Sequence, residues 1–307
     1  MVDILLAVYN GERYLSEQID SILAQSVDEW RLIIQDDGSS DGTIPLVQSY
    51  VERYPERMQL FCNEKNSGSP QKNFFSLLKR AESPYVMTCD HDDVWLPDKI
   101  ERTYAKMMEV ERDFPGKPVL VHTDLRVVDE NLHQLSPSMF ESQCLDPKRD
   151  GFHQLLVQNI ITGCTMMVNR PLLELADRLP EQAIMHDWWL GLIASAFGGI
   201  GFVPEPTILY RQHASNQVGA KNVKDLGFIA RRMQQGRQIK QVIQDTYDQA
   251  NAFLQEFSAQ LPRPIRETAE QYARLPEQSK LGRIRSIFQH DFKKHGLARV
   301  LGQIFYI

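Results

Sequence analysis

The chain has 307 residues, enough for one large domain or for a domain of about 200 residues with an appendage. Its apolar content of 42% and charged content of 24% are those of an ordinary globular protein, and its net charge of −6 argues against nucleic acid as the main partner. No stretch approaches the roughly 18 apolar residues of a transmembrane helix, and the opening MVDILLAVYN lacks the basic region of a signal peptide. Four scattered cysteines without a CxxC pair indicate reduced thiols, so we expect a cytoplasmic protein.

Strand and helix signals alternate along the first 125 residues. Short apolar runs predict strands at 2–8, 30–36, 58–62, 84–90 and 118–124. Apolar residues at helical spacing predict the intervening helices, among them one that starts near Leu15 and others at 71–81 and 97–112. This alternation predicts an α/β fold with a mainly parallel sheet and helices on both faces.

The pattern changes after residue 150. A helix at 151–158, a strand at 165–169 and a helix at 187–197 precede the run FVPEPTILYRQH. Beyond residue 222 the strand signals stop, and three helical segments are predicted, at 223–257, 263–276 and 280–304. We therefore expect an α/β domain at 1–220 and a helical C-terminal region at 221–307.

Polar clusters follow three of the predicted strands. They are Tyr9-Asn10-Gly11-Glu12, Asp36-Asp37-Gly38 and Asp90-His91-Asp92-Asp93. Ligands of parallel sheets bind at the carboxyl ends of the strands, so three clusters at one sheet edge predict one large site.

The cluster at 90–93 places three carboxylates and an imidazole side by side. Like charges this close repel one another and raise carboxylate pKa values, and a bound divalent cation would offset the repulsion. The alternative is an Asp that caps the next helix, with Pro97 in its first turn. A cap requires only one of the three carboxylates.

A dinucleotide-binding site is excluded, because the first strand-to-helix turn reads VYNGERYL and has one glycine where GxGxxG is needed. Instead, the ordered motifs AVYNGERYL, DDGSSDGT, NSGSPQKNF, DHDDVW, HDWW and YRQH, over residues 2–216, resemble the family-2 glycosyltransferases, which have the GT-A fold. The order of the motifs, with NIITGCTMMVNR before HDWW, is most similar to bacterial rhamnosyltransferases that build surface polysaccharides.

The resemblance implies a set of residues that bind the nucleotide of a nucleotide-sugar donor. Tyr9 would stack on a pyrimidine ring, Asp37 would accept a hydrogen bond from its N3–H, and Lys72 would meet the base or the phosphates. If these residues have no role in nucleotide binding, the alternatives are a core aromatic for Tyr9, a turn residue for Asp37 and a solvated helix start for Lys72. The full set implied is Ala7, Tyr9, Glu12, Asp37, Asn66, Lys72, Asp90, His91 and Arg211.

The resemblance also implies a metal and a base. Asp92 and His213 would hold Mn²⁺ or Mg²⁺, Asp90 would lie by the ribose or a metal-bound water, and Arg211 would hold a phosphate. Asp187 would be the catalytic base of an inverting transfer, although His186 stands where the family usually has Glu. The alternatives are a helix cap for Asp187 and a structural role for His213.

The tryptophans that follow Asp187 have two interpretations. Trp188 and Trp189 would form a sugar-stacking wall that binds the acceptor, or they would belong to the core.

The last 29 residues differ from the rest of the chain in charge. Residues 279–307 carry a net charge of +5, with Ile284, Phe288 and Phe292 among the apolar residues between the basic ones. A basic amphipathic helix predicts binding to an anionic membrane surface. The alternatives are a helix packed on the domain and a contact in a homo-oligomer.

Together these features predict a metal-dependent, inverting glycosyltransferase. The expected reaction moves L-rhamnose from dTDP-β-L-rhamnose to a lipid-linked glycan, on the inner face of the cell membrane. The alternatives are a family-2 enzyme that uses UDP-GlcNAc, UDP-glucose or UDP-galactose, and a nucleotide-binding scaffold without catalysis.

Overall fold

The computed structural model describes residues 1–213 and 236–307. These residues form two compact units, each assembled from separate parts of the chain. The first unit contains residues 1–139, 161–177 and 199–213, and the second contains 140–160, 178–198 and 236–307. The expected boundary at residue 220 lies outside the described residues, so the domain division stays a prediction.

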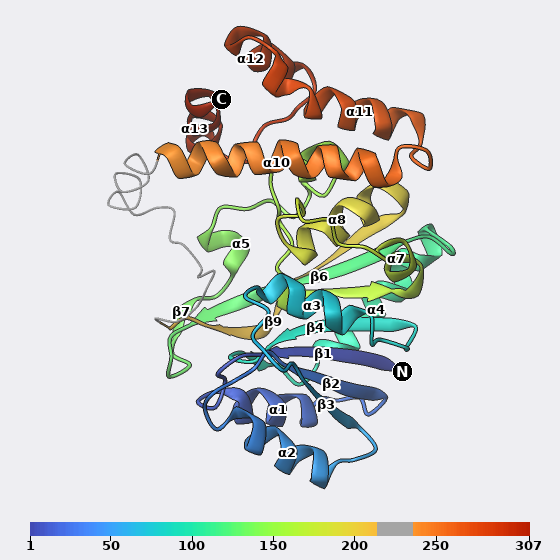
Figure 1. The fold of residues 1–307 in the computed structure, drawn as a ribbon, viewed down its shortest axis with the longest axis vertical. Coiled ribbons are helices and arrows are strands. Elements are labelled where there is room, and N and C mark those ends of the chain that lie inside the picture. Colours follow the sequence, from blue (N-terminus) through green and yellow to red (C-terminus); the bar gives the residue numbers. More distant parts are fainter. Residues whose placement is uncertain (214–235) are drawn as a thin grey trace. The chain divides into compact units, whose positions relative to one another are not determined.

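The strands of the described residues form one sheet in the first unit, in the order β3-β2-β1-β4-β8-β6-β9-β5, with β7 paired to β6 (Figure 1). They are β1 (Val2–Val8), β2 (Trp30–Asp36), β3 (Met58–Cys62), β4 (Tyr85–Asp90), β5 (Val94–Trp95), β6 (Val119–Val128), β7 (Gln134–Ser136), β8 (Met167–Asn169) and β9 (Gly199–Arg211). The strands predicted at 2–8, 30–36 and 58–62 are confirmed at their bounds. Every residue of β1 is buried, as its continuous apolar run predicts.

The sheet is parallel in its first half and mixed in its second. Strands β3, β2, β1 and β4 run parallel, as predicted. Beyond them β8 is antiparallel to both β4 and β6, while β9 is parallel to β6. The alternation of strands and helices predicts only the parallel half, because the segment before β8 has no long crossover helix. It contains only short helices at Met139–Ser142 and Phe152–Leu155 and a 3₁₀ turn, η1 (Gly163–Thr165).

Helices cover the sheet on both faces. In the first unit they are α1 (Leu15–Leu23), α2 (Thr43–Arg53), α3 (Pro70–Leu78), α4 (Lys99–Asp113) and α7 (Arg170–Leu175). The path β1→β2→β3 moves one way across the sheet, and the step from β3 to β4 returns past β1. Since crossovers are right-handed, α1 and α2 lie on one face and α3 on the other (Figure 1). The direction therefore reverses between β1 and β4, the position where such sheets bind ligands.

The second unit is helical. Its helices are α5 (Met139–Ser142), which starts at the last residue of the first unit, α6 (Phe152–Leu155), α8 (His186–Phe197), α10 (Gly236–Phe257), α11 (Arg263–Ala273), η2 (Leu275–Glu277), α12 (Lys280–Gln289) and α13 (Leu297–Tyr306). Aromatic side chains from three of them form its core. Trp189 of α8 lies 5.4 Å from Phe253 and 6.1 Å from Phe257 of α10 between ring centroids, and Phe152 of α6 lies 5.3 Å from Phe253. None of the helices in the described part of the chain is long and apolar enough to cross a membrane.

Two predictions for this unit are wrong in detail. The single helix expected at 280–304 is two helices, because α12 ends at Gln289 and Gly296 before α13 has a φ of +86°, which interrupts a right-handed helix. The helix expected at 151–158 is the short α6. The part of the predicted helix 223–257 before residue 236 lies outside the described residues.

His122 lies fully buried in β6, and its ring centroid is 5.0 Å from that of Phe202. Burial lowers the pKa of His122 to about 3 and that of His186 in α8 to about 4, because the charged imidazolium is costly to desolvate. Both side chains are therefore neutral in the folded protein at pH 7.

We predict that His122→Gln reduces the acid sensitivity of folding. In the unfolded chain His122 gains a proton below pH 6.5, whereas in the folded protein it stays neutral until about pH 3. The contribution of His122 to the free energy of unfolding is therefore highest above pH 6.5 and falls as the pH falls below that value. Between pH 6.5 and 5.0 this loss is about 2 kcal/mol for one such group. Urea unfolding of the full chain at several pH values measures it. Equal slopes for parent and His122→Gln would contradict the account.

Candidate active site

Two loops are joined at the carboxyl end of the parallel strands. The amide of Asn10 donates to Oγ of Ser39 at 2.8 Å, and the amide of Ser40 donates to Oδ1 of Asn10 at 2.9 Å. Asn10 adopts a φ of 49°, which its short polar side chain tolerates. Glu12 accepts from the amide of Gly42 at 2.9 Å, so its carboxylate braces the second loop. A nucleotide contact of Glu12 stays a prediction.

The strand register brings the predicted polar clusters together. Ala7 lies beside Asp90 of β4, and Val8 lies beside Asp36 of β2. The turns that follow β2 and β4 therefore flank the turn that follows β1. Tyr9 in this turn is 45% exposed, which excludes the core-aromatic alternative and leaves its ring available for stacking.

Asp37 is 4% exposed and holds the loop that contains Asn66. Its Oδ1 accepts from Nδ2 of Asn63 at 2.7 Å and from the amide of Ser67 at 2.9 Å, and its Oδ2 accepts from Oγ of Ser67 at 2.7 Å. A carboxylate oxygen can accept two bonds, so Oδ2 retains capacity for one more donor. The contact of Asp37 with a nucleotide base stays a prediction, and its role in holding this loop was not predicted from the sequence.

Asn66 and Gly68 of that loop are exposed. Oδ1 of Asn66 accepts from the amide of Gly68 at 2.7 Å, and Gly68 has a φ of +74° that favours glycine. Lys72, in the first turn of α3, is exposed. Contacts of Asn66 and Lys72 with a nucleotide stay predictions.

The turn after β4 is held by the end of β9. Strand β5 pairs antiparallel with β9, with Val94 beside Leu209 and Trp95 beside Ile208. If this antiparallel register is continued, the turn residues that precede Val94 lie beside the end of β9, at Arg211 and the residues after it. Nε2 of His213 accordingly lies 2.8 Å from Oδ2 of Asp92, although the two residues are 121 positions apart.

The pair formed by Asp92 and His213 fits a hard divalent cation. Two ligands about 2.1 Å from one ion and at right angles to each other lie about 3 Å apart. In the structure the 2.8 Å between Nε2 and Oδ2 is a hydrogen bond, and the same separation would suit adjacent coordination positions if a cation replaced the shared proton. Both side chains are partly exposed, at 13% for Asp92 and 8% for His213, so phosphate oxygens and water could complete the set.

Asp93 plays a different role from Asp92. It is fully buried, and its Oδ1 accepts from the amide of Arg211 at 3.0 Å. Burial, followed by the charges of Asp92 and Asp90, holds the pKa of the Asp93 carboxyl well above its usual range. The Asp93 carboxyl therefore keeps its proton to a higher pH than an ordinary carboxyl does, which reduces the repulsion among the three carboxylates of this cluster.

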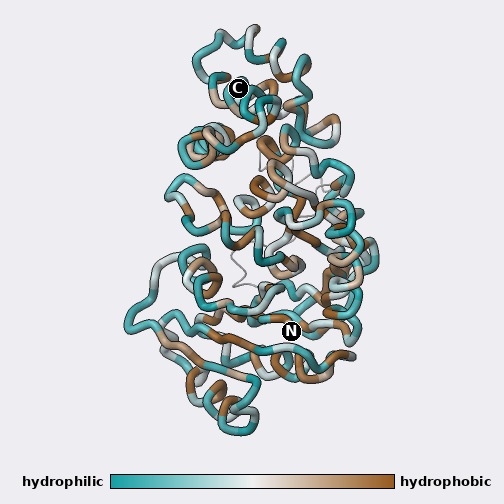
Figure 2. The backbone as a smooth tube through the Cα atoms, turned by 90° about the vertical axis from the view of Figure 1, so that its right-hand side faces the viewer, coloured by the Kyte–Doolittle hydropathy of each residue, from teal (hydrophilic) through white to brown (hydrophobic). Residues whose placement is uncertain are grey.

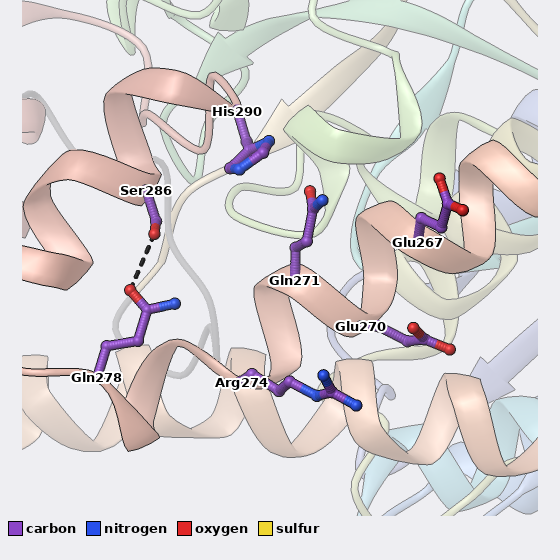
Figure 3. A pocket seen from close by; sticks show the side chains of 7 residues that line it. All are labelled: Glu267, Glu270, Gln271, Arg274, Gln278, Ser286 and His290. Atoms are coloured by element: carbon purple, nitrogen blue, oxygen red, sulfur yellow. Dashed lines mark hydrogen bonds between the residues drawn. The ribbon is translucent and has the colours of Figure 1, made fainter.

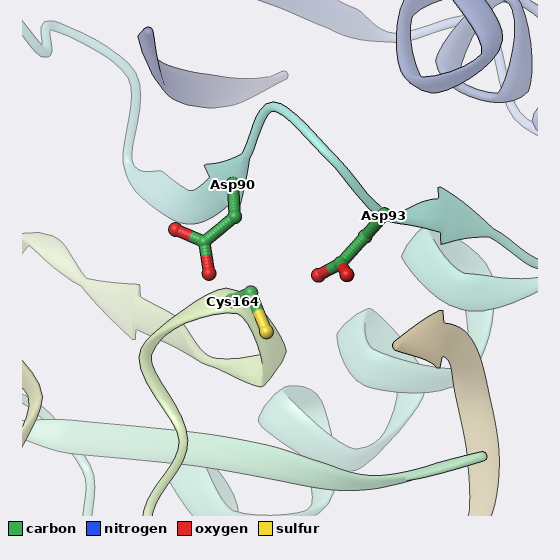
Figure 4. Close-up of side chains that lie close together, drawn as sticks. All are labelled: Asp90, Asp93 and Cys164. Atoms are coloured by element: carbon green, nitrogen blue, oxygen red, sulfur yellow. The ribbon is translucent and has the colours of Figure 1, made fainter. Parts of the chain in front are cut away.

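Asp90, Asp93 and Cys164 lie together below this turn (Figure 4), with ligand-type atoms within 4.8 Å of one another. Burial raises the pKa of the Cys164 thiol well above its usual range, so the sulfur is protonated and is a poor metal ligand. Mg²⁺ and Mn²⁺ also prefer oxygen to sulfur. A metal position on the Asp92 side of the turn stays a prediction.

Arg211 is a buried cation at the end of β9, 1% exposed. Its Nε donates to the carbonyl of Asp92 at 2.8 Å, Nη1 to the carbonyl of Glu130 at 2.7 Å, and Nη2 to Oε2 of Glu17 at 2.6 Å. The guanidinium lies 4.5 Å from the ring centroid of Tyr14. These contacts differ from the phosphate contact predicted from the sequence, and they fix the turn that carries Asp92.

Sequence reasoning missed Glu17, Tyr14 and Glu130 as parts of this arrangement. The ring of Tyr14 lies 4.9 Å from that of His213, and Glu17 forms an ion pair with Arg211. Both belong to the predicted first helix region, where a polar residue reads as solvated. Glu17 lies 194 positions from Arg211, and Glu130 lies 81 positions from it, so no local sequence pattern indicates these contacts.

The residues predicted around the catalytic base belong to the second unit. Asp187 is in the first turn of α8 and is 7% exposed, with Oδ1 2.6 Å from the amide of Trp188. The helix starts at His186 with Met185 as its N-cap residue, so Asp187 is not the N-cap that the alternative requires, although an acidic residue in the first turn favours the helix N-terminus. Its role as base stays a prediction.

The sugar-stacking wall expected of Trp188 and Trp189 is wrong. Trp189 has no exposed surface and packs on Phe253 and Phe257 of α10. Trp188 is 9% exposed, and its indole N–H donates to the carbonyl of Leu155 at 2.5 Å. Both side chains are core residues, because α8 is apolar from Trp188 onwards except for Ser195 and is almost entirely buried.

A separate pocket lies among the C-terminal helices of the second unit. It has a volume of about 300 Å³ and is lined by polar side chains of α11 and α12 and the turn between them, among them Glu270, Arg274, Gln278 and His290 (Figure 3). Ser286 donates to Oε1 of Gln278 at 2.9 Å across one side. None of the residues predicted to bind a donor, metal or acceptor lines it.

Comparisons with known proteins agree with the fold. The chain is similar to S. aureus TarS 1–349, solved in complex with UDP-GlcNAc, with a TM-score of 0.59, 17% identity, and coverage of 94% of this chain and 72% of that one. It is also similar to the mannosyltransferase PcManGT from Pyrobaculum calidifontis, solved in complex with GDP-Man and Mn²⁺, with a TM-score of 0.52, 16% identity, and coverage of 98% and 77%. The fold is therefore the GT-A fold of glycosyltransferases, as predicted.

Sequence comparison gives the family. The dTDP-rhamnosyl transferase RfbG of Shigella flexneri is 26% identical over 226 residues, 70% of this chain and 74% of RfbG. The putative teichuronic acid biosynthesis glycosyltransferase TuaG of Bacillus subtilis is 29% identical over 206 residues, 66% of this chain and 75% of TuaG. The family model described as glycosyl transferase family 2 matches residues 3–175, more than half of the chain. The chain belongs to glycosyl transferase family 2.

Proposed function

We propose that the protein transfers L-rhamnose from dTDP-β-L-rhamnose to a hydroxyl of a lipid-linked glycan, with inversion at the sugar's C1. The acceptor oxygen attacks C1, the bond between C1 and the phosphate oxygen breaks, and dTDP leaves with the bonding electrons. The observation that carries the proposal is the pair formed by Asp92 and His213 at the switch point of the sheet, with side-chain atoms 2.8 Å apart.

The nucleotide would bind where the loops after β1, β2 and β4 meet. The exposed ring of Tyr9 suits stacking on a pyrimidine, and the spare lone pair on Oδ2 of Asp37 suits its N3–H. Ala7, near the end of β1, is paired with Asp90 of β4, so Asp90 and His91 would lie beside the turn that carries Tyr9 and near the ribose. Asn66 and Lys72 would approach from the neighbouring loop and helix.

Asp92 and His213 would hold Mn²⁺ or Mg²⁺, and PcManGT, which shares the fold, was solved with Mn²⁺. Such an ion, when bound, neutralises the charge that grows on the departing diphosphate. Arg211 would act as a positioning residue, because its guanidinium fixes the backbone of Asp92 and no sugar or phosphate need touch it. Asp187 would accept the proton of the acceptor hydroxyl, by its place in the family's motif.

The choice of sugar is supported by the similarity to RfbG, a dTDP-rhamnosyl transferase. The rival within the same class is transfer from a UDP-sugar. This alternative is supported by the fold that the chain shares with TarS, which was solved in complex with UDP-GlcNAc. A non-catalytic scaffold is disfavoured, because binding alone requires no base at Asp187.

A donor panel tests the proposal. The purified protein is incubated with dTDP-β-L-rhamnose, UDP-GlcNAc, UDP-glucose or UDP-galactose, each with and without Mn²⁺, and the release of nucleoside diphosphate is measured. Release from dTDP-rhamnose above the others supports the proposed donor. Preferential release from a UDP-sugar would replace that donor, and release from none, with tight dTDP binding retained, would favour the scaffold.

Asp92→Asn is expected to lower turnover by on the order of 10²- to 10³-fold, because an amide oxygen without charge holds a divalent cation poorly. The matched control is Asp98→Asn, at an exposed carboxylate in an ion pair with Arg102, and it should keep the parent rate. Chelation of the parent should reproduce the loss, and added Mn²⁺ should restore it. A parent rate that chelator leaves unchanged would contradict a metal-dependent reaction.

Arg211→Lys tests the positioning role. One ammonium cannot reach the three acceptors that the guanidinium serves, so we expect the affinity for Mn²⁺ to fall about 10- to 100-fold, the range for residues that orient metal ligands. Calorimetry with dTDP should then show weaker binding in the presence of Mn²⁺ and unchanged binding in its absence. Glu17→Gln should shift Mn²⁺ affinity in the same direction. Weaker dTDP binding without metal would instead indicate a direct phosphate contact.

Asp187→Asn keeps the size of the side chain and removes the proton acceptor. We expect kcat to fall by about 10²- to 10⁴-fold while the Kd of the donor changes little. The exposed Glu181→Gln, in the same unit, serves as control and should turn over normally. A variant that folds and retains the parent kcat would refute the assignment of the base.

A further inference from the structure

The last two helices expose an unusual amount of apolar surface. Five large apolar side chains in α12 and α13 are between 52% and 81% exposed, and they are nearly half of the exposed large apolar side chains in residues 1–213 and 236–307. We call these five side chains the apolar tail face: Leu281, Phe288, Leu297, Leu301 and Phe305. Two of the residues that the sequence suggested for this role behave differently, because Phe292 is fully buried and Ile284 is partly covered.

The exposed side chains are arranged as helix stripes. In α12, Leu281, Arg285 and Phe288 recur at intervals of four and three residues, which places them on one side of the helix. In α13, Leu297, Leu301 and Phe305 recur at intervals of four. The alternation of apolar and polar residues along this part of the chain is visible in Figure 2.

The opposite sides of both helices are anchored in the second unit. Ile287 of α12 is fully buried and Gln303 of α13 is 5% exposed. Nε2 of Gln303 donates to the carbonyl of Phe292 at 2.8 Å, and the Phe292 ring packs on Tyr272 of α11 with centroids 5.0 Å apart. The stripes are therefore held outward by a fixed core contact.

The two stripes are neighbours. Nζ of Lys280, at the start of α12, donates to the carbonyl of Phe305, at the end of α13, at 3.0 Å. At their other ends the helices are joined by the short segment 290–296, in which the amide of Lys294 donates to Oε1 of Gln303 at 3.0 Å. The apolar tail face is thus carried by two helices tied at both ends.

Basic side chains accompany this face. Residues 279–307 carry a net charge of +5, and Lys280 and Arg285 are exposed next to Leu281. A second copy of the chain would bring two such positive segments together, which is unfavourable. An anionic lipid surface offers the opposite charge as well as an apolar layer at the depth of the acyl chains.

We propose that the apolar tail face docks α12 and α13 into the interface of an anionic membrane, with Lys280 and Arg285 at the level of the lipid phosphates. The inference deepens the proposed function, on which it rests for a lipid-linked acceptor, by naming the surface that holds the enzyme beside that acceptor. The lipids serve as a solvent for the face and take no part in the transfer.

The test is binding of the full-length protein to vesicles that contain no glycan and no nucleotide. One set is phosphatidylcholine with 30% phosphatidylglycerol and the other is phosphatidylcholine alone. We expect binding to the anionic set at least about tenfold tighter, and weaker at high salt. Leu297→Gln with Leu301→Gln should weaken binding by about tenfold or more, since Gln preserves helix formation while removing the apolar contact. Lys280→Gln with Arg285→Gln should reduce the preference for anionic lipid.

The matched control is Val242→Gln, an exposed apolar residue on α10 of the same unit, which should bind as the parent does. Release of nucleoside diphosphate in solution is measured in parallel, so that a loss of catalysis and a loss of docking are distinguished. Parent-level vesicle binding by Leu297→Gln with Leu301→Gln overturns the proposal. So does a parent that is dimeric and binds no vesicles but becomes monomeric in this double variant, because the face would then be a contact between two copies.

Discussion

The contact between the turn after β4 and the end of β9 is the interaction on which the candidate site depends. A short antiparallel pairing of β5 with β9 sets the register, and three contacts then fix the turn. Arg211 holds the Asp92 carbonyl, its own amide holds the Asp93 carboxyl, and His213 meets the Asp92 side chain. Without β9 at this edge, Asp92 would lie on an unsupported turn, and one carboxylate cannot fix a divalent cation with useful affinity.

The same contact accounts for the density of acidic groups that follows β4. Asp93 is desolvated and keeps its proton, so it contributes shape and a hydrogen bond but no charge. Lys99, buried behind the turn, donates to the carbonyl of Thr165 at 3.4 Å and lies 4.8 Å from the ring centroid of Trp95. Burial lowers the pKa of Lys99 to about 8, so its ammonium still carries charge at neutral pH. The protonated Asp93 carboxyl and the buried Lys99 ammonium both reduce the repulsion among the acidic groups of this turn.

The sequence predicts those features that a local pattern determines. The strands at 2–8, 30–36 and 58–62 are found at their predicted bounds, because a continuous apolar run of that length is specific for a strand buried on both faces. The position of the site follows as well, since polar clusters after parallel strands must meet at one edge of the sheet. Motif resemblance supplied the pairing of Asp92 with His213, which no spacing rule could give across 121 residues.

Features that depend on tertiary packing were not predictable. Trp188 and Trp189 follow a motif and are large enough to contact a sugar, but α10 covers Trp189 with Phe253 and Phe257. The phosphate contact expected of Arg211 stays a prediction, and no local pattern reveals the three acceptors that its guanidinium contacts on separate parts of the chain. In the tail, helical spacing suggested one helix, whereas Gly296 separates two, and this break decides which apolar side chains are exposed.

The central claim is that Asp92 and His213 jointly hold the cation that meets the donor's diphosphate. The most direct test is a crystal structure of the full-length protein with dTDP and Mn²⁺, in which the ion is located by its anomalous scattering. The account predicts an anomalous peak about 2.1–2.3 Å from Oδ2 of Asp92 and from Nε2 of His213, in contact with the diphosphate, with the base beside Tyr9. A peak coordinated by Asp90, Asp93 and Cys164 without Asp92, or dTDP bound with no ion near Asp92, would contradict it.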